Sequence, residues 1–194
     1  MAVGARKNLA AGSVVYLALA GATLSLPGSV IVASGDTTSY TTVGRAAKPV
    51  YNDTTWVQIP AIESVELTVD NGQGIEIWEP GPGAIEIADI LRVGRKLTLK
   101  IMSQTTQPLT WQLLYRSLGL NATSTAYTPA AVPNEVYAWV KLQYYDNANN
   151  LTQYADLYCE IVLGSAIKLD PKAIVKPEYN GTVLSSALNT GNFA

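Results

Sequence analysis

The sequence predicts a mainly β fold with one short flanking α-helix, and three observations carry this prediction. Apolar and polar residues alternate with a period of two through 62–70, 96–101 and 136–163, as in strands with one buried face. Clusters of glycine, proline and asparagine separate these runs, as turns require. Only the stretch 108–118 has apolar residues at helical spacing. At 194 residues, the chain is expected to form a single domain, 1–194.

The first expected strand, Val14–Leu17, lies in a segment that imitates a secretory signal. Arg6 and Lys7 precede the apolar stretch 9–20, and Ala20-Gly21-Ala22 is similar to a cleavage site. Glycine and serine dilute the stretch, so we expect a retained, ordered strand, with secretion as the alternative. No run reaches the roughly 18 to 20 continuous apolar residues that span a bilayer.

A long loop is expected at 33–55. It lies between two short predicted strands, Val30–Val32 and Trp56–Ile59, and is rich in Gly, Ser, Thr and Asp. Loops of this length in a compact domain usually have a function or a partner. We also expect residues 1–12 to form an extended N-terminal arm.

The next strand, 62–70, has the clearest alternation, with Val65, Leu67 and Val69 on one face. Asn71–Gly74 is expected to reverse the chain into a hairpin, because Asn and Gly tolerate the positive φ of tight turns. Shorter strands are expected beyond it, with a break at Glu79–Gly83 where proline and glycine interrupt pairing.

A helix is expected from Pro108 to Leu118. Pro108 suits the first helical position, and Trp111, Leu114 and Tyr115 follow at the spacing of one helix face. Trp111 and Tyr115 are expected to pack against the sheet rather than stack on a ligand.

The longest predicted hairpin joins 136–145 to 151–163 through a turn at 146–150. Its polar face carries bulky aromatic rings where a monomer would keep charge, and such rings are enriched at protein interfaces. A final strand, Tyr179–Leu188, and a loose C-terminal arm, 189–194, should follow. The residues expected at subunit interfaces are Tyr40, Tyr137, Trp139, Tyr145, Tyr154 and Tyr158.

The composition argues against most enzyme classes. The chain has no His, so Ser-His-Asp and Cys-His catalysis and imidazole metal sites are excluded. Cys159 is the single cysteine, which excludes an intrachain disulfide and favours a small core residue. A net charge of −2 gives no basic patch for gripping nucleic acid, and only 14% of residues are charged. We therefore expect no enzyme, cofactor or metal, and a surface that neighbouring subunits cover.

One segment is acidic although the chain is nearly neutral. Seven carboxylates and no Lys or Arg lie from Glu63 to Asp89. A glycosidase carboxylate pair, a calcium site around Asp70, a solvated sheet face and the wall of a passage that repels phosphates are the four interpretations. The last requires an oligomer.

The layout of these elements resembles the tail tube (major tail) proteins of long-tailed bacteriophages. The resemblance rests on 59–69 followed by a turn, on 89–101 leading into a helix around 109–115, on the long hairpin, and on 170–177 before a terminal strand. It covers residues 56–188 as an order of elements and includes no diagnostic motif.

This resemblance implies a β-sandwich flanked by a short helix, whose inner sheets join into a β-barrel ring when six copies assemble. Stacked rings would form a tube through which the genome passes, with tape-measure and tail-completion proteins as partners. The protein would be made in the host cytoplasm and reside in the virion tail. The loop 33–55 and both arms would contact neighbouring rings. The lumen-facing candidates are Glu63, Glu66, Asp70 and Glu76.

Two other functions remain as alternatives. A capsid decoration or tail-completion protein would form one closed layer, whereas a tube subunit stacks head to tail without limit. A secreted β-sandwich module would use its aromatic residues to bind carbohydrate or protein ligands.

Overall fold

The computed structural model describes residues 12–24, 42–81, 84–115, 135–164, 167 and 175–193. It confirms a mainly β fold with one short helix. The expected strand Val30–Val32 and most of the arm 1–12 lie outside the described residues. No helix in the described ranges is long and apolar enough to cross a membrane.

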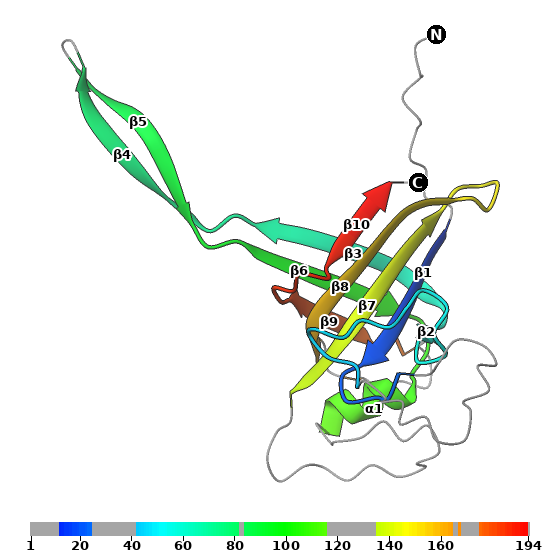
Figure 1. Ribbon diagram of the computed structural model, residues 1–194. Helices are drawn as coiled ribbons and strands as arrows, with labels where there is room; N and C mark the ends of the chain where they lie inside the picture. Colours follow the sequence, from blue (N-terminus) through cyan, green and yellow to red (C-terminus); the bar gives the residue numbers. More distant parts are fainter. Residues whose placement is uncertain are drawn as a thin grey trace, which may run out of the picture.

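Most strands join one antiparallel sheet in the order β2-β1-β7-β8-β9-β6-β3, and β10 pairs with β8 beside this path (Figure 1). A separate pair, β4 and β5, projects from the sheet. The strands are β1 (Gly12–Leu19), β2 (Val57–Ile59), β3 (Ile62–Asp70), β4 (Gln73–Gly81), β5 (Ala84–Val93), β6 (Lys96–Ser103), β7 (Val136–Tyr145), β8 (Leu151–Leu163), β9 (Glu178–Val183) and β10 (Thr190–Phe193).

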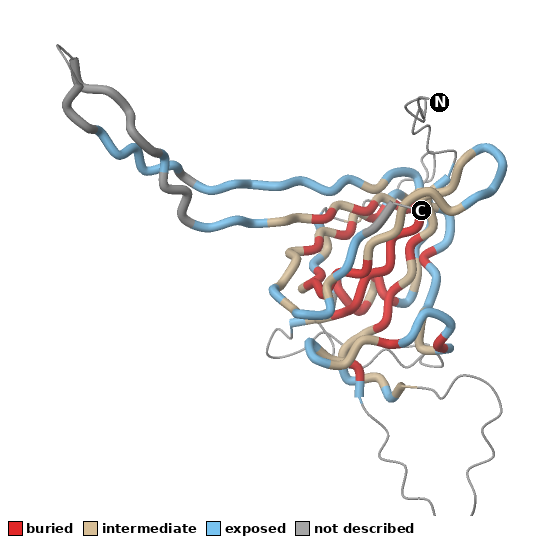
Figure 2. The backbone as a smooth tube through the Cα atoms, turned by 45° about the horizontal axis from the view of Figure 1, so that its top comes forward, coloured by how far each residue is buried: buried red, intermediate tan, exposed pale blue. Residues whose placement is uncertain are grey.

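One face of the sheet is the main hydrophobic core, and the predicted alternation of the late hairpin is confirmed there. Val140 of β7, Leu157 of β8 and Leu99 of β6 belong to the same buried cluster. Figure 2 shows the buried residues gathered within the sheet, while the residues of the projecting strands whose burial is described are exposed. The alternation works because successive side chains of a strand point to opposite faces.

The expected two-sheet sandwich takes the form of a single curled sheet. Its two ends approach one another. β1, the neighbour of the end strand β2, contacts the end strand β3, and the hydroxyl of Ser103 at the end of β6 donates to the carbonyl of Pro60 after β2 at 3.0 Å. The curl lets one continuous sheet enclose its own core. The sheet order leaves it open between β2 and β3, so no closed barrel forms within one chain.

The helix α1 (Pro108–Tyr115) covers the core from one side, but with a different face from the one expected. Leu109 and Leu113 are buried in the core, whereas Leu114 is exposed. The Thr110 hydroxyl lies 2.5 Å from that of Tyr179, which ties the helix to β9. The helix ends at Tyr115, and the rest of the expected range lies outside the described residues.

The expected hairpin at Asn71–Gly74 is wrong. The chain continues from β3 into β4 and reverses only between Gly81 and Ala84, because β3 pairs with β6 and β4 with β5. Gly72 (φ 69°) and Gly94 (φ 85°) lie opposite one another between the two paired regions. The turn-forming residues therefore make a joint in a long two-stranded arm.

The expected loose tail at 189–194 is also wrong for its described part. Thr190–Phe193 forms β10, which pairs with β8 over Gln153–Asp156. The last strand before it, β9, ends at Val183 rather than at Leu188.

Candidate functional site

The two strands β4 and β5, here called the ribbon, carry four exposed large apolar residues among those described, Ile75, Ile77, Trp78 and Ile90. Ile75 is 55% exposed and Trp78 is 53% exposed, although a folded chain usually buries side chains of this kind. Alternation along β4 puts Ile75 and Ile77 on one face and Trp78 on the other. Both faces of the ribbon therefore offer apolar surface to a partner.

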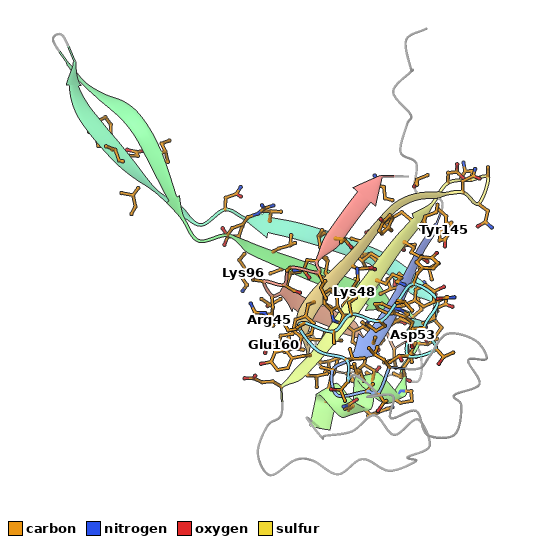
Figure 3. All side chains as sticks on the ribbon, in the orientation of Figure 1. Arg45, Lys48, Asp53, Lys96, Tyr145 and Glu160 are labelled. Atoms are coloured by element: carbon orange, nitrogen blue, oxygen red, sulfur yellow. The ribbon has the colours of Figure 1, made fainter. Side chains whose placement is uncertain are left out.

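Two carboxylates of the acidic segment lie across from lysines in the folded chain. Glu66 lies directly across from Lys100, and Asp70 directly across from Lys96, on the same face of β3 and β6. Lys100 also binds Glu178 of β9 at 2.9 Å. Figure 3 places Lys96 where the ribbon leaves the sheet.

Four of these charged residues, Glu66, Lys96, Lys100 and Glu178, line a shallow polar groove of about 530 Å³ across β3, β6 and β9, and Asp70 lies beside it across from Lys96. Thr68, Thr98 and Thr182 form a row across it, since each pairs directly with the next. The groove thus alternates carboxylates, lysines and hydroxyls, which is a balanced rather than an acidic surface.

The two remaining lumen candidates lie apart from this groove. Glu63 forms an ion pair with Lys176 at 2.8 Å. Glu76 lies on the ribbon across from Ile90. The structure therefore brings Glu66 and Asp70 together and separates Glu63 and Glu76 from them.

Residues 42–56, here called the strap, cross the face of the sheet opposite the main core. Val43 of the strap packs with Trp139 and Tyr158 in a second buried cluster. Trp139 is 0% exposed, and its indole N–H donates to the Gly44 carbonyl at 2.8 Å. Tyr158 is 6% exposed and lies against the Trp139 ring. The strap therefore leaves almost no surface of Trp139 or Tyr158 for a neighbouring subunit.

Two lysines hold the strap in place. Lys48 pairs with Asp156 of β8 at 3.0 Å. Lys141 of β7 donates to the Tyr51 carbonyl at 2.8 Å, and its ammonium lies 4.2 Å from the centre of the Trp56 ring. Burial lowers the pKa of Lys141, because desolvation disfavours its charged form.

The other aromatic candidates keep part of their surface. Tyr137 stacks on Tyr158 and donates to Glu135, and this hydrogen bond raises the pKa of Tyr137 to about 12. The Tyr145 hydroxyl donates to Gln143 at 3.1 Å. Tyr154 is half-buried between β7 and β10. The remaining candidate, Tyr40, lies outside the described residues.

Cys159 is a core residue, as the alternation of its strand predicts. It is fully buried, and burial raises the pKa of its thiol to about 12. A thiol of this kind stays protonated and unreactive near neutral pH. Within the described residues, no group of three or more metal-binding side chains comes together.

Sequence reasoning missed the role of the strap. Lys141 occupies a polar-face position of an alternating strand, which indicates a solvated lysine. The sequence feature that could have indicated this role is the pair Tyr51 and Trp56, two aromatic residues in a segment otherwise rich in small polar residues.

The sequence matches no protein-family model and no curated protein.

Proposed function

We propose that the chain is the structural subunit of a bacteriophage tail tube, which self-assembles into hexameric rings that stack head to tail. The ribbon carries this proposal. It projects from the sheet (Figure 1), and it exposes large apolar residues on both faces. Surface of this kind marks a site of protein association.

The open sheet supports the same conclusion. Within the described residues, β2 and β3 end the sheet and each pairs along one side only. Free strand edges favour pairing with other chains, and ring closure removes them. In the proposed ring, edges of neighbouring copies join into one barrel, which provides the lumen that a single chain lacks.

The proposed lumen wall is the polar groove over β3, β6 and β9. Its lysines face carboxylates, so a passing phosphate backbone meets no free basic stripe. The genome would slide through without specific binding. Tape-measure and tail-completion proteins are the further partners proposed, and the virion tail is the proposed location.

Electron microscopy of the purified full-length chain tests this function. We expect sixfold rings and tubes that lengthen with protein concentration. A single closed layer that never stacks would favour a decoration or completion protein. A chain that stays monomeric at millimolar concentration would contradict the proposal, and a monomer cleaved after Ala22 in cells would favour a secreted module.

A further inference from the structure

A second apolar feature lies where β1, β2 and the start of α1 meet. It is a groove of about 240 Å³, here called the base groove, lined by Leu17, Leu19, Val57, Ile59 and Leu109 among others. None of its described lining residues is charged. Val57, at the rim, is 64% exposed. The base groove is thus suited to an apolar occupant.

A buried amide indicates that this occupant also carries a hydrogen-bond acceptor. Gln107 lines the base groove, and its side-chain Nε2 is buried with no hydrogen-bond partner among the described residues. A buried donor without a partner costs free energy comparable to a lost hydrogen bond. An acceptor arriving with the occupant would remove this cost.

The ribbon is both apolar and able to accept a hydrogen bond. Its side chains Ile75, Ile77 and Trp78 are exposed and apolar. Its outer edges pair with no described strand, so they present backbone carbonyl groups as acceptors. The ribbon and the base groove therefore match in polarity and in hydrogen bonding.

The ribbon of a chain points away from that chain's own base groove. It leaves the sheet on the side opposite β2 and α1 (Figure 1). At about 3.3 Å per residue, the nine residues of β4 reach about 30 Å beyond the joint. A ribbon that fills the base groove must therefore come from another copy, in a head-to-tail contact that can repeat indefinitely.

We propose that the ribbon of one copy docks in the base groove of a second copy, with Trp78 as the apolar anchor and a ribbon carbonyl accepting from Gln107. This inference rests on the proposed tube function and names the contact that propagates it. A head-to-tail contact uses two different surfaces, so each surface can be disabled separately.

The test uses Trp78→Glu to disable the ribbon and Val57→Glu to disable the base groove. Both side chains are exposed in the single chain, so both variants should fold. Each variant alone should need about thirtyfold more protein to assemble, the loss expected for an interface hot spot. Leu188→Glu, at an exposed apolar residue outside both surfaces, is the matched control and should assemble like the wild type.

Mixing the two variants gives the decisive result. The intact base groove of Trp78→Glu should accept the intact ribbon of Val57→Glu, whose own base groove is blocked. When rings of the two variants are mixed, sedimentation should show pairs of rings, one of each variant, that do not lengthen with concentration. Normal assembly of either variant alone, or no association in the mixture, would overturn the docking proposal.

Cysteine cross-linking distinguishes this contact from the tube function itself. Chains with Glu76→Cys, which keep Trp78, mixed with chains with Gln58→Cys, which keep Val57, should cross-link, because the native Cys159 is buried and does not compete. If the wild type forms tubes but the two cysteine variants do not cross-link, the docking proposal is overturned and the tube function stands. A cross-linked dimer without any tubes would leave the contact standing and overturn the tube function.

Discussion

Trp139, which lies beneath the strap, contributes much of the stability of the sheet face opposite the main core. Trp139 is fully buried and holds the Gly44 carbonyl through its indole N–H. Trp139→Phe should lower the free energy of unfolding by about 1–3 kcal/mol, because the carbonyl loses its partner. Trp139→Ala should cost about 3–5 kcal/mol, because it also leaves a cavity. Urea denaturation measures both changes.

The matched control is Trp78→Ala, which removes the same kind of side chain from the exposed ribbon. In the monomer it should change the unfolding free energy by less than about 0.5 kcal/mol. Equal losses at the two positions would contradict the burial of Trp139 beneath the strap.

Cys159 makes the stability depend on pH in a defined window. Its folded pKa is raised to about 12 from the ordinary 9.0, so the unfolded chain loses the thiol proton first. The thiol's stabilising contribution is fully present below pH 9 and is lost as the pH rises towards 12. Between pH 8 and pH 10, wild type should lose about 1.4 kcal/mol relative to Cys159→Ala. A constant difference between the two proteins would contradict this linkage.

At the scale of elements, sequence patterns identified strands better than they identified turns. The strands β3, β6, β7 and β8 follow from local alternation, and β1 from a short apolar run. Two turn signatures, Asn71–Gly74 and Glu79–Gly83, compete for one chain reversal. Which one reverses the chain depends on the pairing of β3 with β6, a contact between distant segments that local patterns do not contain.

The joint between β3–β6 and β4–β5 provides an element-scale prediction. Gly94 has a positive φ of 85°, and a Cβ there would meet no atom within 4 Å, so Gly94→Ala changes conformational energy alone. We expect a loss of about 1–2 kcal/mol, because a left-handed conformation is costly for alanine. Faster hydrogen exchange of β4 and β5 amides would report it. Gly44→Ala, which has equal space and no positive φ, is the control.

The candidate site could be predicted only in part, because its chemistry depends on pairing across strands. The sequence separates the acids at 63–89 from Lys96 and Lys100, whereas antiparallel pairing puts those lysines across from Asp70 and Glu66. Likewise, nothing local to Trp139 indicates that the strap covers it. The exposed apolar residues of the ribbon become evident only once the joint replaces the expected turn.

For the whole molecule, the balanced polar groove has a consequence for DNA. The double variant Glu66→Gln/Asp70→Asn removes the carboxylates that face Lys100 and Lys96. Assembled tubes of this variant should retain DNA at low salt and release it as salt rises, whereas wild-type tubes should not retain it. Co-sedimentation of DNA with tubes measures this. Glu135→Gln, which removes an exposed carboxylate outside the groove, should behave like wild type.

The position of β1 in the sheet sets an order of events during synthesis. β1 is the first described strand to be made, yet it pairs with β7 from Gly12↔Tyr145 to Leu19↔Ala138, across most of the chain. By contrast, the arm formed by β3, β4, β5 and β6 pairs segments that are close together in the sequence. Pairing across long loops is slow to form. A nascent chain therefore completes its projecting arm early. β1 can pair with β2 at this stage, but its other edge stays unpaired until β7 is made, and chaperone binding to the emerging chain should concentrate on β1.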